Sequence, residues 1–200
     1  MRICITLDDV VRNKTFQIGK VYKKYINNDI NLKSLDFSTN DYCKIFNFKS
    51  KNEYNKFLYE DYVFQIFAEA DACENQLGVN LNKWLLKLND IDEDEDEPVD
   101  VMLSNINEFN ISIAFTYFFL SKIGTRIRKV FFPIDKKEIW DNCDVLVTAN
   151  PELLNDKPEG KKTIKINTDY NSECKSDFEY DFLSEFLRDE EIINKLKNNK

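Results

Sequence analysis

With 200 residues, 42% of them hydrophobic, the chain is long enough for one domain with a sizeable buried core. Its net charge of -8 disfavours nonspecific binding to nucleic acid, which needs clusters of Lys and Arg to neutralise phosphates. Five scattered cysteines and no histidine exclude a His-containing zinc site and indicate reduced thiols. The sequence shows no signal peptide and no run of about 20 apolar residues, so we expect a soluble intracellular protein.

A short buried strand is predicted over residues 2–6, and it leads directly into acidic residues. Asp8 and Asp9 follow the strand, and a helix is predicted over residues 14–27. Many α/β folds use this order, a hydrophobic strand, acidic residues and then a helix, to place carboxylates at the carboxyl edge of a sheet. The first residues therefore predict an α/β fold with a candidate site after the first strand.

A largely helical insertion is predicted between this strand and the next. After the helix at 14–27, residues 32–48 are expected to be irregular, 52–72 to be amphipathic and helical, and 81–88 to form another helix. Aromatic side chains of the amphipathic stretch are expected to be core or a partner surface: Tyr54, Tyr59, Tyr62, Phe64 and Phe67. The acidic run at 90–97 predicts a solvated linker.

Strands and helices alternate after this linker. Strands are predicted at 99–104, 129–132, 144–147 and 162–166. Helices are predicted at 109–122, 136–140 and 178–197. Apolar strands alternating with helices indicate a mainly parallel sheet covered on both faces. We therefore predict a Rossmann-like α/β core formed by residues 1–13 and 98–200, with a helical cap inserted at 14–89 and a linker at 90–97.

The order of these features resembles the haloacid dehalogenase-like (HAD-like) superfamily, and within it the small nucleotidase-like branch with a helical cap after the first strand. The resemblance covers the whole chain. It implies four stations: an Asp nucleophile with an acid/base Asp two residues later, a phosphate-binding Ser or Thr, a charge-neutralising Lys, and an acidic pair that holds magnesium. The corresponding residues are Thr6 with Asp8, Ser104, Lys136 or Lys137, and Thr148 with Ala149.

Most of the acidic chemistry that the resemblance implies is missing from these positions. Thr6 is neutral and cannot replace a carboxylate nucleophile without an adjacent base. Thr148 and Ala149 leave too few oxygen ligands for magnesium. A register shifted by two residues, with Asp8 as the nucleophile, puts Val10 at the acid/base position and fails as well. We therefore expect no enzyme activity, no catalytic residue, no bound metal and no cofactor.

The remaining polar residues favour structural roles. Asp9 would need Asp141 or Asp144 to complete a metal site, but Asp144 begins its strand and so belongs to the end away from the site. Asp9 and the carboxylate before it are expected to cap the following helix. Ser104 and Lys136 are expected to be a turn residue and a solvated helix residue, with phosphate binding as the alternative.

A fold that has lost its catalytic carboxylates points to binding or assembly. We expect an inactive structural protein that forms homo-oligomers. Its residue usage, typical of an AT-rich genome, and its small capped form resemble proteins of crAss-like phages. This implies a virion component such as a neck or tail ring, assembled in the host cytoplasm, whose partners are other virion proteins rather than nucleic acid or membrane. Two alternatives stay open: a magnesium-dependent nucleotide phosphohydrolase, 5'-nucleotidase-like, and a nucleotide- or phosphate-sensing module without turnover.

Overall fold

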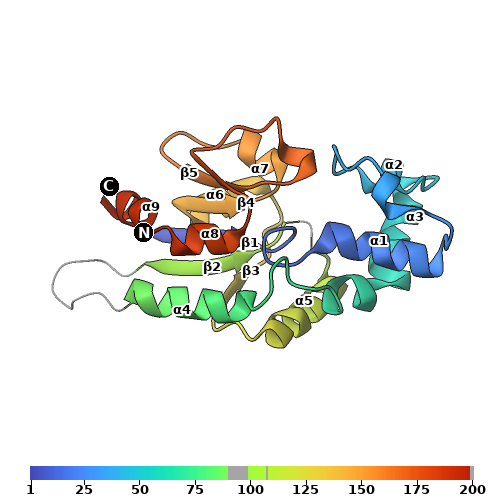
Figure 1. Ribbon diagram of the computed structural model, residues 1–200, viewed down its shortest axis with the longest axis horizontal. Coiled ribbons are helices and arrows are strands. Elements are labelled where there is room, and N and C mark those ends of the chain that lie inside the picture. The colour runs from blue at the N-terminus through green and yellow to red at the C-terminus, as the bar shows by residue number, and fades with distance from the viewer. Residues whose placement is uncertain (90–98, 107, 199–200) are drawn as a thin grey trace.

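The computed structural model describes residues 1–89, 99–106 and 108–198, which form a six-stranded sheet with surrounding helices (Figure 1). All neighbouring strands are parallel, in the order β3-β2-β1-β4-β5-β6. The strands are β1 (Arg2–Thr6), β2 (Asp100–Ser104), β3 (Lys129–Phe131), β4 (Val145–Thr148), β5 (Lys162–Ile166) and β6 (Phe178–Tyr180). The predicted Rossmann-like α/β class is confirmed.

Helical segments connect the strands and form an insertion after β1, at the right in Figure 1. The insertion contains α1 (Lys14–Tyr25), η1 (Leu32–Ser34), α2 (Tyr42–Ile45), α3 (Lys51–Lys56), η2 (Phe57–Asp61) and η3 (Phe64–Ala68). The other segments are α4 (Leu77–Asn89), α5 (Asn110–Ile123), α6 (Lys136–Asn142), α7 (Pro151–Asn155), η4 (Asp169–Asn171), α8 (Leu183–Arg188) and α9 (Glu190–Asn198). Among the described residues, no helix is both long enough and apolar enough to span a membrane.

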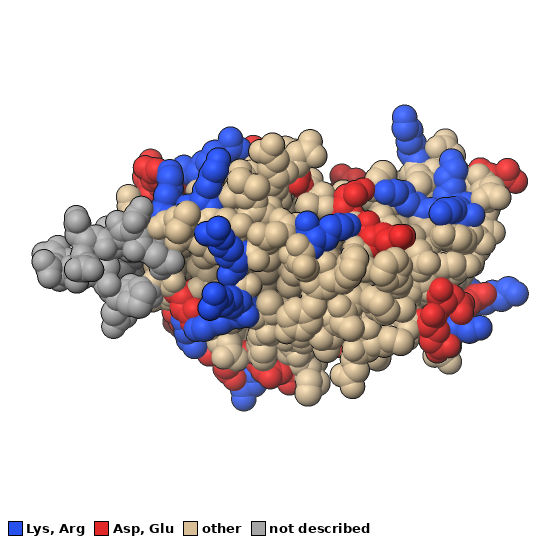
Figure 2. Space-filling model, turned by 90° about the horizontal axis from the view of Figure 1, so that it is seen from below, with Lys and Arg blue, Asp and Glu red and all other residues tan. Residues whose placement is uncertain are grey.

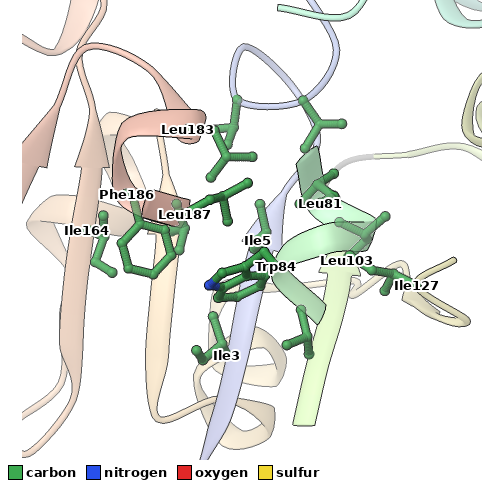
Figure 3. Close-up of a cluster of buried hydrophobic side chains, with 14 of the residues drawn as sticks. Ile3, Ile5, Leu81, Trp84, Leu103, Ile127, Ile164, Leu183, Phe186 and Leu187 are labelled. Atoms are coloured by element: carbon green, nitrogen blue, oxygen red, sulfur yellow. The ribbon is translucent and has the colours of Figure 1, made fainter. Parts of the chain in front are cut away.

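The side chains of the central strand β1 alternate between two hydrophobic clusters, because successive residues of a strand point to opposite faces. Ile3 and Ile5 belong to a cluster that includes Trp84 of α4 and Phe186 of α8 (Figure 3). Cys4 belongs to a second cluster, formed with side chains of α6 and α7. The sheet is therefore covered on both faces around its central strand.

Local sequence signals set the ends of several helices. The Asn13 side chain caps α1 by accepting a hydrogen bond from the backbone N–H of Phe16. Asn150 caps α7, which begins with Pro151, a residue whose fixed φ suits the first helical position. Helix α5 ends at Gly124, whose φ of 70° is the left-handed conformation that glycine adopts at helix ends.

The insertion has a hydrophobic cluster of its own, rich in aromatic side chains. Tyr22 packs against Phe46 and Phe57 with ring centroids 4.8 and 6.1 Å apart. The stretch predicted at 52–72 is largely helical but interrupted: α3 is followed by the π-helical segments η2 and η3. Of its aromatic residues, Phe67 is buried, as predicted for a core residue, whereas Phe64 is 38% exposed.

The two passages of the chain between the sheet and the insertion lie side by side. The backbone N–H of Asn13 donates to the carbonyl of Asp71 at 2.9 Å, and that of Cys73 donates to Val11 at 3.0 Å. Between these bonds, Arg12 forms an antiparallel bridge with the other passage. We call this pairing the hinge ladder.

Helix α4 extends over residues 77–89 and is longer than the predicted helix at 81–88. The predicted cap, 14–89, included this segment, but Leu81 and Trp84 pack with the sheet in the main cluster rather than with the cluster of the insertion. The amphipathic sequence of α4 predicts that one face of the helix is buried, but it does not predict which hydrophobic cluster that face packs against. The predicted linker at 90–97 lies outside the described residues.

The prediction of one terminal helix over 178–197 is wrong. Residues Phe178–Tyr180 form strand β6 at the edge of the sheet, paired with β5, and α8 and α9 follow as separate helices. Phe178 and Tyr180 are spaced by two residues, as in a strand, and helical spacing of apolar residues begins only at Leu183. A three-residue strand gives too short a pattern to separate from the helix behind it.

Candidate active-site cleft

A cleft with a volume of about 730 Å³ opens at the carboxyl edge of the sheet, beside the insertion. The strand ends and the loops after them contribute Thr6, Asp8, Asn105 and Asn150. Parallel strands bring their carboxyl ends to the same edge, which is why residues distant in sequence meet here. Cationic and aromatic side chains from the insertion complete the wall, among them Lys14, Lys44, Lys51, Tyr54 and Tyr59.

Two threonine hydroxyls meet at the strand ends. Thr6 Oγ1 donates to Thr148 Oγ1 at 3.0 Å, and both side chains are buried. They meet because β1 and β4 are adjacent and in register, with Ile5 opposite Val147. The next residue, Ala149, is also buried and adds no polar side-chain atom. This pair of neutral hydroxyls stands where the resemblance implies carboxylates.

Asp8 lines the cleft but is held by three donors. Its carboxylate accepts hydrogen bonds from Arg12 Nη2 at 2.5 Å, Lys14 Nζ at 2.6 Å and Asn105 Nδ2 at 3.0 Å. Burial acts to raise the pKa of Asp8, but the charges of Arg12 and Lys14 outweigh it and hold the pKa well below its usual range. At neutral pH the group is therefore an ionised, fully engaged carboxylate.

Arg12 joins the loop after β1 to helix α5 through a buried network. Its Nη2 lies 2.7 Å from Glu108 Oε1, and neither side chain is exposed to solvent. Arg12 Nη1 also donates to Thr116 Oγ1 at 2.7 Å, and the guanidinium lies 4.8 Å from the centre of the Phe67 ring. Arg12 and Glu108 are not among the residues predicted from the sequence. The available signal was weak: Arg12 follows Asp8 by four residues, and nothing in the spacing indicates Glu108.

Asp9 turns its carboxylate away from Asp8. Its backbone has a φ of 58°, and its carboxylate accepts hydrogen bonds from the backbone N–H and the hydroxyl of Thr15, at 2.9 and 2.6 Å. Tyr170 OH donates to it as well, at 2.9 Å. Burial raises the pKa of Asp9 above its usual value. The N–H of Thr15 belongs to the first turn of α1, so this bond caps the helix as predicted for Asp9. The same prediction for Asp8 is wrong, because the hydrogen bonds of its carboxylate come from side chains. Asp144 binds Arg2, at the opposite end of the sheet.

The remaining predicted positions lie outside the polar part of the cleft. Ser104 is fully buried and pairs in register with Thr6, while the next residue, Asn105, faces the cleft. Lys136 forms an ion pair with Asp156 and Lys137 is exposed, and neither lines the cleft. The lysine that contacts the strand-end carboxylate is therefore Lys14, from the insertion, with its Nζ 2.6 Å from Asp8.

The residues at these stations do not fit magnesium. Mg²⁺ prefers several hard oxygen ligands in octahedral geometry, usually including carboxylates. Here Asp8 is already neutralised by cations, Asp9 is bonded elsewhere, and Thr6 and Thr148 bond to each other. In the part of the chain that the structure describes, no group of three or more His, Cys, Asp or Glu side chains is arranged to hold a metal ion.

A comparison with solved structures relates this architecture to a known one. The chain superimposes on a protein from Burkholderia xenovorans LB400 assigned as a haloacid dehalogenase-like hydrolase, with a TM-score of 0.59 and 96% of each chain covered. The fold is HAD-like. No family model and no curated protein matches the sequence. Because the two chains are only 9% identical, the likeness shows the fold alone, and any activity has to be argued from the site.

Proposed function

We propose that this HAD-like chain is catalytically inactive and acts as a structural component of an assembly. The observation that carries the first half is the state of Asp8, bound at once to Arg12, Lys14 and Asn105. A general acid must hold a proton near the working pH and release it to the leaving group. A carboxylate whose pKa is held well below its usual range has no proton to give at neutral pH.

The position of the nucleophile supports the same proposal. Thr6 would have to attack phosphorus through its hydroxyl, and a neutral hydroxyl needs an adjacent base to accept its proton. Its hydrogen-bond partners at the strand ends are the Thr148 hydroxyl at 3.0 Å and the Val147 carbonyl at 3.4 Å. Neither oxygen is basic enough for that role, so phosphoryl transfer lacks its first step.

An exposed apolar surface supports the assembly role. Ile111, Tyr117 and Phe118 of α5 are about half exposed, and Phe64 of η3 packs beside Phe118 with ring centroids 5.8 Å apart. We call these four residues the α5 patch. Figure 2 shows the face of the molecule on which α4 and α5 lie, with a broad area free of charged side chains. Exposed apolar side chains that gather in an area without charges mark interaction sites. The proposed partner is another copy of the chain, in a virion ring as its composition suggests.

Magnesium-dependent nucleotide hydrolysis is the second candidate, and two observations favour it. The cleft of about 730 Å³ is large enough for a nucleotide, and its position at the strand ends is where α/β folds bind ligands. The Burkholderia protein of the same fold is assigned as a hydrolase. For hydrolysis, Asp8 would have to break its hydrogen bonds to Arg12, Lys14 and Asn105 in order to act as an acid or base. An inactive protein requires no such change.

A phosphatase assay separates the two. The purified protein is incubated with nucleoside 5'-monophosphates and Mg²⁺, and released phosphate is measured for the wild type and for Asp8→Asn. We expect both proteins to stay at the background rate. Phosphate release by the wild type that disappears in Asp8→Asn would establish the hydrolase and overturn the inactive assignment.

The mass of the native particle tests the assembly role. Native mass spectrometry is expected to give a mass above the 23.7 kDa of one chain. Phe118→Glu places a charge in the α5 patch and is expected to shift the mass to that of the monomer. Ile134→Glu is the matched control, because Ile134 is 91% exposed and lies outside the patch. A wild-type protein that stays monomeric, or equal behaviour of the two variants, would contradict assembly through this surface.

A further inference from the structure

A second cavity of about 440 Å³ lies between α1, the segment around η1 and the loops after β5 and β6. Asp9 and Tyr170 line both this cavity and the cleft, so the two are neighbours that share this pair of residues. Its volume falls within the range of about 300–1,000 Å³ typical of small-molecule sites. None of the residues aligned with the catalytic stations lines it.

The cavity is negatively charged. Four carboxylates and one lysine line it: Asp9, Glu74, Asp169, Asp181 and Lys33. The carboxylates of Asp9 and Glu74 are both half-buried and are held by neutral donors. Asp9 accepts from Thr15 and Tyr170, and Glu74 accepts from the backbone N–H and the hydroxyl of Ser184. Within the described residues, neither carboxylate forms an ion pair with a lysine or arginine side chain.

Aromatic side chains form the apolar part of the same cavity. Phe16 and Phe182 are each 52% exposed although they line it, and Phe37 adds a third ring. Lys20 Nζ lies 5.5 Å from the centre of the Phe16 ring, so this ring already receives a cation. Cations are attracted to the faces of aromatic rings, and the attraction adds to that of nearby carboxylates.

We propose that this cavity binds a small organic cation, an ammonium group on an apolar or aromatic body. The ammonium group would lie near Asp9 and Glu74, the two carboxylates that have only neutral donors. The body would lie against Phe182 and Phe37. An inorganic cation would leave these rings without a role, and an anion would face the carboxylates. The inference goes beyond the assembly role and does not depend on it.

Ligand-detected NMR tests the proposal with a defined set of probes. Phenethylammonium is titrated into the protein, with 2-phenylethanol as the neutral probe of similar shape and phenylacetate as the anionic one. We expect saturable binding of phenethylammonium with a Kd at or below about 1 mM. We expect the alcohol and the carboxylate to bind at least about tenfold more weakly.

Charge-neutralising variants locate the site. Asp181→Asn and Glu74→Gln are each expected to weaken phenethylammonium binding about threefold or more, because each removes a carboxylate from the lining. Asp41→Asn is the matched control: it removes the same charge from the cleft, where Asp41 lies, and should leave binding unchanged. Asp181 is exposed, so its variant keeps the test valid if Glu74→Gln fails to fold.

Three results would overturn the proposal. The first is no saturable binding of phenethylammonium up to about 10 mM. The second is equal binding of phenethylammonium and 2-phenylethanol, which would remove the role of the carboxylates. The third is a loss in Asp41→Asn as large as that in Asp181→Asn, which would assign the cation to the cleft instead.

Discussion

Replacing Arg12 by Met should destabilise the protein far more than replacing any exposed arginine. The substitution keeps an unbranched apolar stem but removes the cation from Glu108 and Asp8, which lie 2.7 and 2.5 Å away. The Glu108 side chain has no solvent exposure, so it is left as an uncompensated buried carboxylate. Loss of one partner of a buried pair costs about 3–5 kcal/mol, a large part of a typical total stability of about 5–15 kcal/mol.

Urea unfolding measures this effect. With a loss of about 4 kcal/mol and a slope of about 2 kcal/mol/M, the unfolding midpoint of Arg12→Met should fall by about 2 M. Arg2→Met is the control, because Arg2 and Asp144 form an ion pair in which the side chains are 41% and 44% exposed. That pair should contribute no more than about 1 kcal/mol.

A double variant tests the reason for the loss. In Arg12→Met/Glu108→Gln the buried negative charge is gone, so part of the lost stability should return, and the two substitutions should not be additive. The reasoning is refuted if Arg12→Met costs no more than Arg2→Met. It is also refuted if Glu108→Gln makes the Arg12→Met protein still less stable.

Three further predictions follow from single positions. A Cβ at Gly78 would lie 1.8 Å from the carbonyl oxygen of Ile123, so Gly78→Ala should lower the free energy of unfolding by at least about 2 kcal/mol. At Gly19 an added Cβ meets only side-chain atoms, the nearest at 3.3 Å, so Gly19→Ala should change the free energy of unfolding by less than about 1 kcal/mol in the same urea titration. The pKa of Asp8 is lowered in the folded state, so the contribution of its charge to the free energy of unfolding is complete above the unfolded pKa of about 3.9 and is lost as the pH falls further. The free energy of unfolding of the wild type should therefore drop more steeply than that of Asp8→Asn between pH 5 and 3. Parallel curves for the two proteins would contradict this. Burial raises the pKa of Cys143 to about 12, so this thiol should react with a disulfide reagent at pH 8 only on unfolding, as mass spectrometry of the labelled protein would show.

The sequence was informative where buried strands carry continuous apolar runs. Strand β1 and its neighbours were predicted close to their observed bounds because each combines such a run with a polar residue at its end. Strand β6 could not be predicted, because three residues at the sheet edge, Phe178–Tyr180, gain strand structure from pairing with β5 rather than from their own pattern. Local sequence does not contain that partner.

Some contacts of the candidate site could likewise be predicted from the sequence, and others could not. The meeting of Thr6 with Thr148 follows from strand order, because parallel neighbours bring their ends together. The burial of Arg12 does not follow from its neighbours in sequence. It depends on Glu108 and Thr116, about 100 residues away, and on Phe67 from the insertion. A charged residue in an unremarkable position is expected at the surface, and only the packed structure shows that it lies inside.

The hinge ladder has a mechanical consequence. Both passages of the chain between sheet and insertion are tied to each other, through Asn13 with Asp71 and Cys73 with Val11. A load applied to the far end of the insertion is thus shared by two backbones instead of stretching either one as a loose tether. Since one of those backbones leads through residues 7–11 into β1, a force on the insertion would be transmitted to a central strand of the sheet.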